Sequence, residues 1–468
     1  MKLFIPWFLC VCELRKACSY RATFMWMCLV LVGLSIRHDL AGVTSLVRAG
    51  WLVPRAYYSL LNMFHSRSLK LDKLTELWIQ MCLKLFNPLR EGKRFVCVAD
   101  GIKIPKEGKK MPAVKKLHQD SEDNNKAEFI FGHSFQVVGL LAVGALGHIC
   151  SVPLASRIHE GLVFSNRDKR SLLDKLAALF LSISHVLDEP VILIADAYYA
   201  SKKVIRPLIK KGHHLVARIR SNSVGWYPAP KLEKRKRGRP RFYGEKVRLR
   251  DFWSKLDRFV TDRSPVYGEV NVMLSYCSVD LLWRPIGKLV RFVLVNHPLR
   301  GRMILMTTDC SIDPLRVIAL YGYRFKIEVS FKQAIHTLGT YAYHFWMKAM
   351  TPISRRSGNQ YLHMKTDEYR RLVRRKMDAY HRYVQLGCIA QGLLQHLSLN
   401  YRKKVWAHFN SWLRTMNPSQ PPSEAVVAQA LRSSLPEFLL SVPDTHELKK
   451  FIVQNIDFER CRPLQLTG

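Results

Sequence analysis

Residues 191–196, Val-Ile-Leu-Ile-Ala-Asp, form an uninterrupted apolar run that ends on a carboxylate. Residues 95–100, Phe-Val-Cys-Val-Ala-Asp, repeat this pattern, and Gly101 follows. Short apolar runs without polar alternation are typical of strands buried on both faces of a sheet. If the two strands are neighbours, Asp100 and Asp196 lie at the same edge of that sheet. Two carboxylates there form an oxygen site suited to Mg²⁺. The alternative is that either aspartate only caps a turn.

The segments around these two strands predict an α/β fold. Apolar residues recur at helical spacing over 169–186 and 201–212, and apolar runs typical of strands occupy 137–143, 149–154 and 214–219. Residues 1–90 and 366–400 have helical patterns, whereas 220–302 are rich in short strand patterns. A further helical pattern starts at Pro314 and runs to about residue 350. This order of elements is typical of an α/β domain with a mixed sheet.

The charge of the chain indicates a polyanionic partner. Of 468 residues, 74 are Lys or Arg and 36 are Asp or Glu, which gives a net charge of +38. A positive field of this size favours nucleic acid over a small metabolite. A membrane is the alternative, but the most apolar stretch, 24–36, is shorter than the ~20 residues of a membrane-spanning helix, so we predict buried helices there. The 11 cysteines include no Cys-x-x-Cys motif, which favours free thiols in a reducing compartment without structural zinc.

The third element is residues 321–328, Tyr-Gly-Tyr-Arg-Phe-Lys-Ile-Glu, which follow an apolar strand ending in Thr307-Thr308-Asp309. The spacing Tyr-x2-Arg-x3-Glu resembles the signature box of the DDE insertion-sequence transposases of the IS-four type. Residues 99–101, Ala-Asp-Gly, resemble the first-aspartate motif of this family, and residues 194–199, Ile-Ala-Asp-Ala-Tyr-Tyr, its second. The resemblance extends over roughly residues 40–400.

This resemblance implies a ribonuclease-H-like catalytic domain. Asp100, Asp196 and Glu328 would hold two Mg²⁺ ions, with Mn²⁺ as an alternative ion, while Tyr321 and Arg324 would support Glu328 and contact DNA. The implied activity is metal-dependent cleavage of DNA at insertion-sequence ends, followed by strand transfer into target DNA. The alternative function is a catalytically inactive DNA-binding protein on a transposase scaffold.

The residues of the signature box are spaced for one helix face. At ~100° per residue, an unbroken helix places Glu328 about 20° from Tyr321, and Arg324 can pair with Glu328 four residues on. The alternative is an ordinary surface ion pair. The chain departs from the family at Ile335, where the family box has lysine. Lys332 lies on the same face, so we predict that it takes over that role; the alternative is an ordinary solvated lysine.

A basic loop in the β-rich segment is the strongest candidate for DNA contact outside the acids. Residues 231–250 hold ten Lys or Arg and two Glu, and Arg-Gly-Arg-Pro at 237–240 resembles the core of a minor-groove AT-hook. The predicted DNA-binding residues are Arg235, Lys236, Arg237, Arg239 and Arg241. The alternative is a solvated loop that contacts phosphates without sequence preference. A further basic patch comprises Arg355, Arg356, Arg370, Arg371, Arg374, Arg375 and Lys376.

Trp226 lies in the same β-rich segment, where a tryptophan could hold an extruded base by stacking. The alternative is a tryptophan in the core of that segment. The chain as a whole is predicted to have five segments: a helical N-terminal DNA-binding region at 1–90, the first part of the catalytic core at 91–219, a β-rich insertion at 220–302, the second part of the core with the Glu-bearing helix at 303–350, and a basic helical region at 351–468. We expect a homodimer on paired double-stranded DNA ends, in the bacterial cytoplasm.

Overall fold

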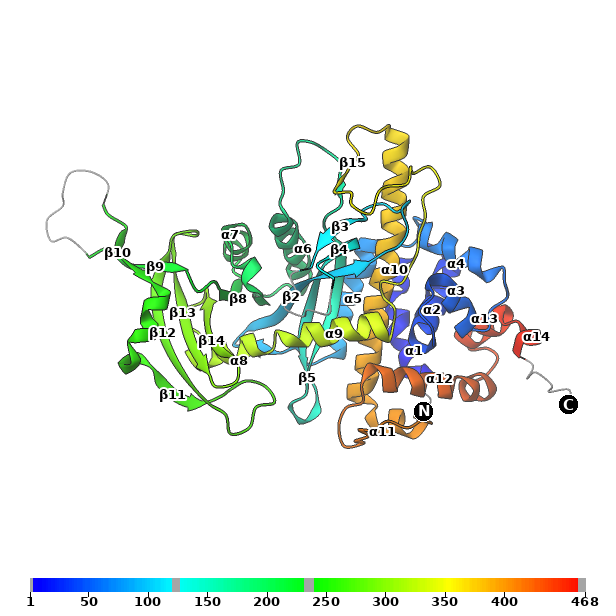
Figure 1. Cartoon of the computed structure of the whole chain (residues 1–468). Helices are drawn as coiled ribbons and strands as arrows, with labels where there is room; N and C mark the ends of the chain where they lie inside the picture. Colours follow the sequence, from blue (N-terminus) through cyan, green and yellow to red (C-terminus); the bar gives the residue numbers. More distant parts are fainter. Residues whose placement is uncertain (1–2, 120–126, 231–239, 462–468) are drawn as a thin grey trace. The chain divides into compact units, whose positions relative to one another are not determined.

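The computed structural model describes residues 3–119, 127–230 and 240–461 of the 468-residue chain. These residues divide into two compact units, and each unit is assembled from segments far apart in sequence (Figure 1). The first unit comprises Met1–Pro88, Gly101–Lys169 and Val329–Gly468, and the second comprises Leu89–Asp100 and Arg170–Glu328. Strand β2 (Arg94–Pro105) and helix α9 (Phe325–His336) each contribute residues to both units.

The second unit contains a mixed sheet whose parallel part is formed by the predicted apolar strands. The first residues of β2 pair in parallel with β7 (Val191–Ala195), and β7 pairs in parallel with β8 (His214–Ile219). All five residues of β7 are buried, as its unbroken apolar run predicts. Antiparallel strands continue the sheet beyond β8 in the order β14, β13, β12, β9 and β10, with β11 paired to β12. Their bounds are β9 Val224–Pro228, β10 Tyr243–Arg248, β11 Val260–Arg263, β12 Met273–Trp283, β13 Lys288–His297 and β14 Gly301–Thr307.

Helices cover both faces of the parallel strands of this sheet. Helices α6 (Leu172–Leu187) and α7 (Lys202–Lys210) lie on one side, and α8 (Pro314–Gly322) lies on the other (Figure 1). Helix α8 begins where the sequence predicts, because the Asp313 carboxylate accepts from the Leu315 and Arg316 amides and Pro314 fits the first turn. Since both faces of β7 and β8 are covered, the strand ends are the accessible parts of this layer.

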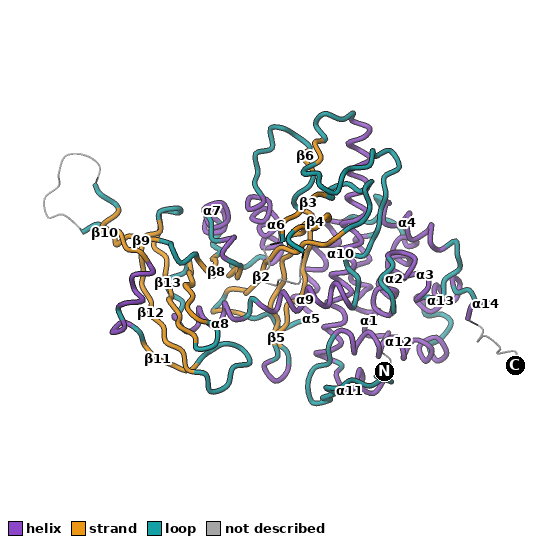
Figure 2. Tube along the Cα trace, viewed as in Figure 1, coloured by secondary structure: helices purple, strands orange, loops and turns teal. Residues whose placement is uncertain are grey.

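The first unit combines a helical bundle with an antiparallel sheet. Its long central helix, α10 (Asp367–Asn400), packs against helices from both ends of the chain, including α2, α4, α5 and α12. Figure 2 shows these helices in purple. The remaining helices are α1 Phe4–Cys12, α2 Arg21–Ile36, α3 Gly42–Ala49, α4 Ala56–His65, α5 Leu71–Leu85, α11 Arg402–His408, α12 Glu424–Ser441, α13 Glu447–Asn455 and α14 Phe458–Cys461. None of the helices in the described ranges is long and apolar enough to cross a membrane.

Strands β3 (Lys115–His118) and β5 (Ile149–Ile158) flank β4 (Phe129–Val143) in the sheet of the first unit. The last residues of β2 lie next to β4 as well. A separate parallel pair joins β6 (Leu162–Val163) to β15 (Gln360–Tyr361). Strand β5 packs on α10 and α5, so this sheet lies against the helical bundle of its own unit.

Two of the predicted elements have different bounds in the structure. Strand β2 does not end at Asp100 but continues to Pro105, because its later residues find new partners in β4. The predicted helix from Pro314 to about residue 350 is wrong: α8 ends at Gly322, α9 covers Phe325–His336, and no helix occupies 337–366. In that last stretch, burial alternates at Tyr341, 343, 345 and 347, which is the period of an extended chain rather than a helix.

Candidate functional site

The register of the parallel strands brings Asp100 and Asp196 together. Val98 pairs with Ile194, so two residues further along the strands Asp100 stands level with Asp196. The backbone of Asp196 is still extended, with φ −74° and ψ 172°. Both side chains therefore point to the same face of the sheet, on strands about 4.8 Å apart. The expectation that the two acids share one edge agrees with this arrangement.

Helix α8 carries the signature box to that same edge. Near its start, Arg316 Nε donates to Glu91 Oε2 at 2.5 Å, beside the end of the sheet where β2 begins. Its contacts with β14, β8 and β7 show that it runs across the face of the sheet. The last turn of α8 holds Tyr321. The residues that follow it reach the C-terminal end of β7, where Asp196 and Asp100 lie.

Tyr321 and Glu328 do not share one unbroken helix. The chain passes from α8 to α9 through Tyr323 and Arg324, where the Arg324 amide donates to Tyr321 O at 3.0 Å and the Lys326 amide to Tyr323 O at 3.0 Å. These bonds span three residues instead of four, which tightens the turn beyond 100° per residue. The predicted angle of 20° between Tyr321 and Glu328 is therefore wrong, because it assumed regular helix.

Arg324 joins the acid of the strand to the acid of the helix. One of its terminal nitrogens donates to Asp100 Oδ2 at 3.1 Å and the other to Glu328 Oε1 at 2.6 Å. The side chains of Arg324 and Asp100 are 23% and 22% exposed, whereas that of Glu328 is 54% exposed. The bond to Asp100 is thus the more sheltered of the two. We refer to Asp100, Asp196, Tyr321, Arg324 and Glu328 as the acid cluster.

The charges of the acid cluster act on one another. Burial raises the pKa of the Tyr321 phenol, Arg324 opposes this rise, and Asp196 adds to it. Burial alone would lower the pKa of the Arg324 guanidinium, but Glu328, Tyr321 and Asp100 together hold it above its ordinary value. Arg324 is therefore a permanent cation among these acids, and Tyr321 is neutral at physiological pH.

The donor chemistry of the acid cluster fits a hard divalent cation. Asp100, Asp196 and Glu328 offer only carboxylate oxygens, which are the ligands that Mg²⁺ prefers. A positive group, the Arg324 guanidinium, already lies between two of these carboxylates. In the ranges that the structure describes, no three His, Cys, Asp or Glu side chains, those of the acid cluster included, are grouped so that they could hold a metal ion as they lie. Because Arg324 is hydrogen-bonded to Asp100 and Glu328, a metal that binds these two carboxylates would have to displace it.

The structure adds one basic residue to this edge that the sequence analysis missed. Ala195 of β7 pairs with Ala217 of β8, so Arg218 stands level with Asp196 in the next strand. Its charge lowers the pKa of Tyr321. The sequence held a signal for it, because the polar Arg218 interrupts the apolar run of β8. Asp309, by contrast, lies at the other edge, where its carboxylate pairs with Arg94 at 2.9 Å.

The other predicted site residues lie outside the acid cluster. Lys332 is exposed on α9, and in the described part of the chain its side chain makes no hydrogen bond or ion pair. Trp226 is half-buried in β9, with its ring 5.7 Å from that of Tyr243 and 5.9 Å from the Arg284 guanidinium carbon. Arg241 is exposed just before β10. The predicted DNA-binding residues Arg235, Lys236, Arg237 and Arg239 fall outside the described residues.

Part of the chain is similar to a known family of protein domains. None of the curated proteins matches this chain. Residues 162–339 match a family model described as Transposase DDE domain. The match includes Asp196, Tyr321, Arg324 and Glu328, but it covers less than half of the chain and leaves out Asp100. The similarity of residues 162–339 to this domain supports a DDE transposase, in which a mixed α/β sheet carries the acid cluster at one edge.

Proposed function

We propose that this chain is a DDE transposase that cleaves DNA at the ends of an insertion sequence and joins those ends to target DNA. One observation carries the proposal: Asp100, which lies outside the matched segment, stands level with Asp196 and is held by Arg324 of the signature box. Acids at this edge serve no purpose in binding a polyanion, whereas phosphodiester chemistry needs them. We infer a ribonuclease-H-like catalytic core from the same arrangement.

Each residue of the acid cluster has a role in this proposal. Asp100, Asp196 and Glu328 would hold two Mg²⁺ ions, or Mn²⁺ in their place, which when bound activate a water or a 3′-hydroxyl and stabilise the leaving oxygen. Arg324 orients Asp100 and Glu328 through its two hydrogen bonds. Tyr321, as a neutral phenol, is a hydrogen-bond donor for a phosphate oxygen. Lys332 is free to bind a neighbouring phosphate.

The remaining parts of the proposal concern the handling of DNA. The basic loop residues Arg235, Lys236, Arg237, Arg239 and Arg241 would follow the duplex backbone, and Trp226 would hold an extruded base. Residues 91–219 and 303–350 would form the catalytic core, with 220–302 as its insertion and 1–90 as a further DNA-binding region. We propose that two copies of the chain act together on paired DNA ends, since both ends of an element must be joined. We also propose that the protein works in the bacterial cytoplasm.

A second candidate is a catalytically inactive DNA-binding protein on a transposase scaffold. One departure favours it, because Ile335 stands where the related family has a lysine. The acid cluster argues against it: Arg324 still connects Asp100 with Glu328, and both aspartates keep their common register.

The test is cleavage, with Mg²⁺ or Mn²⁺, of a DNA fragment that carries the sequences flanking the gene on both sides. Asp100→Asn and Asp196→Asn should each lose cleavage by at least about a thousandfold, while binding of the same fragment stays within roughly threefold. Asp313→Asn is the matched control, because it makes the same change in the same unit and asparagine still caps α8. Cleavage by Asp196→Asn would overturn the proposal. A wild-type protein that binds the ends but never cuts them would establish the second candidate.

A further inference from the structure

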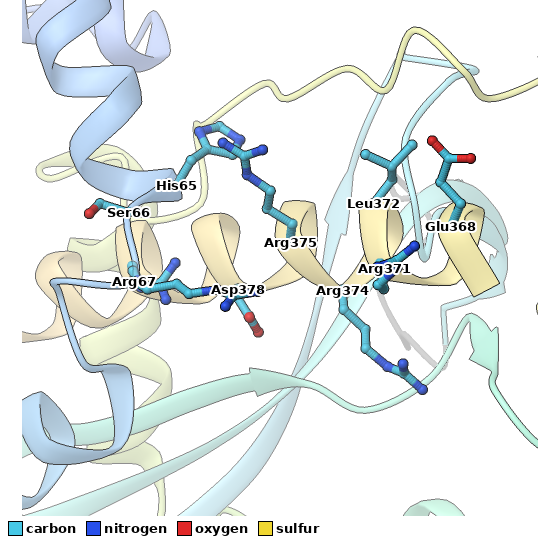
Figure 3. Close-up of a pocket in the computed structure, with 10 residues that line it drawn as sticks. His65, Ser66, Arg67, Glu368, Arg371, Leu372, Arg374, Arg375 and Asp378 are labelled. Carbon is cyan, nitrogen blue, oxygen red and sulfur yellow. The ribbon is translucent and has the colours of Figure 1, made fainter.

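A cavity of about 790 Å³ lies in the first unit, between α10 and the loop that follows α4. Five arginines line it: Arg67, Arg371, Arg374, Arg375 and Arg382. Two acids, Glu368 and Asp378, are also in its lining, so positive charge prevails. Figure 3 shows that Arg375 extends toward His65, while Arg67 comes from the loop opposite the helix. We call this cavity the arginine pocket.

The helix positions its arginines in a way that costs stability. Arg371 lies three residues before Arg374 and four residues before Arg375 on α10, and like charges at these spacings repel. Arg374 and Arg375 leave the helix in opposite directions (Figure 3), and the Arg374 guanidinium carbon lies 4.8 Å from the centre of the Phe164 ring. The same helix does pair Arg370 with Asp367. No such pairing extends to the pocket: in the described ranges, the side chains of Arg67, Arg371 and Arg375 make no hydrogen bond or ion pair. Their guanidinium groups are therefore available to a ligand.

The floor of the arginine pocket is fixed by buried hydrogen bonds. Arg382 is 7% exposed and donates to Leu69 O and Phe64 O, both at 2.8 Å. These bonds hold the loop after α4 against α10 and thereby fix the place of Arg67. His65 uses Nδ1 for Leu61 O at 2.8 Å, which leaves its buried Nε2 without a partner among the described residues. A pre-formed floor with an unsatisfied polar atom is typical of a binding site.

We propose that the arginine pocket binds a backbone phosphate of DNA, at a site separate from the acid cluster. Guanidinium groups match phosphate oxygens in a bidentate fashion, and several arginines converging from two elements suit one doubly contacted phosphate. The five arginines of the lining outnumber its two acids, so a bound phosphate reduces the repulsion between Arg371 and Arg375. The identity of the polyanion as DNA rests on the proposed function.

The test is the salt dependence of duplex binding by the full chain, measured by fluorescence anisotropy from 50 to 300 mM KCl with a labelled duplex. The pocket variant is Arg371→Gln with Arg375→Gln. The matched control is Arg414→Gln with Lys450→Gln, which removes the same charge from exposed side chains of the same unit that lie outside both the pocket and the basic patch. Each lost phosphate contact lowers the slope of log affinity against log salt by about 0.9. We expect a slope change of about 1 to 2 and an affinity loss of roughly 10- to 100-fold in the pocket variant only.

The outcomes separate this inference from the proposed function. If the pocket variant loses no more affinity or slope than the control, the arginine pocket is not a DNA site, although cleavage by the wild type would still support a transposase. A wild type that binds no duplex overturns both. Inorganic pyrophosphate is a second probe, read by thermal shift. If pyrophosphate stabilises the wild type but not the pocket variant, and duplex binding is the same in both, the occupant is a free phosphate compound and the DNA assignment is wrong. Arg371→Lys with Arg375→Lys, which keeps the charge, should lie between the pocket variant and the wild type.

Discussion

Replacing Arg324 by alanine should make the acid cluster bind a divalent cation more tightly in the absence of DNA. Arg324 donates to Asp100 at 3.1 Å and to Glu328 at 2.6 Å, so the guanidinium occupies two of the three proposed ligands. A metal ion must displace those bonds before it can use the same oxygens. The variant removes both the competitor and one positive charge beside the site, and both changes favour the metal.

The size of the effect follows from how exposed the two ion pairs are. The pair with Glu328 is mostly solvated, because that carboxylate is 54% exposed, whereas Asp100 is only 22% exposed. Pairs in such settings stabilise by about 0.2–1 kcal/mol each, with the more sheltered one near the upper value. Together they amount to about 1–2 kcal/mol, which corresponds to a roughly 5- to 30-fold gain in metal affinity.

The assay is titration of the full chain with Mn²⁺, with free Mn²⁺ followed by electron paramagnetic resonance and no DNA present. Arg316→Ala is the matched control, because it breaks an ion pair with Glu91 in the same unit, near the opposite edge of the sheet. It should leave the Mn²⁺ affinity unchanged, and Asp100→Asn should weaken it. Equal or weaker Mn²⁺ binding by Arg324→Ala would refute the competition. Since DNA is absent, any separate role of Arg324 in holding phosphates does not enter the result.

Two further predictions concern stability. Burial lowers the pKa of His133 from 6.5 to about 3, and its ring donates Nε2–H to Pro112 O at 2.9 Å, so it is neutral when folded. Below pH 6.5 the unfolded chain takes up a proton at this histidine and the folded chain does not, so the free energy of unfolding decreases as the pH is lowered. His133→Gln should make this decrease smaller by about 1–2 kcal/mol between pH 6.5 and 5, measured by urea unfolding. The same pH dependence in the variant and the wild type would contradict this. At the start of α6, Ser171 and Asp174 form a reciprocal capping box. Ser171→Ala should therefore lower the free energy of unfolding by about 1 kcal/mol, whereas Ser182→Ala on the same helix, where the hydroxyl is exposed, should change it little; equal losses would exclude the cap as the cause.

Several elements could be predicted from local patterns alone. The apolar runs at 191–195 and 214–219 are β7 and β8 with the predicted bounds. A strand buried on both faces is apolar along its length, so its bounds can be predicted from its own residues. Helix α8 starts at Pro314 for an equally local reason, since Asp313 caps it. Among the site residues, Asp100 and Asp196 could be singled out because each interrupts or ends such a run.

Other features depended on contacts between distant segments. The helical pattern after Pro314 could not show the break at Tyr323 and Arg324, nor the extended course beyond residue 337, because buried aromatic residues fit both periods over a short stretch. The close approach of Gly322 to Val266, where an added Cβ would lie 3.2 Å from a methyl group, is likewise a tertiary contact at this point.

The sequence by itself determined the chemistry that this protein offers: two strand-borne aspartates, a glutamate with an arginine four residues before it, and a net charge of +38. Only the tertiary structure decided which of these groups meet. The register of β2 against β7 makes Asp100 level with Asp196, and the turn after α8 directs Arg324 to Asp100. Register is set by hydrogen bonds between strands far apart in sequence, and a single-residue shift would have turned one aspartate to the other face of the sheet.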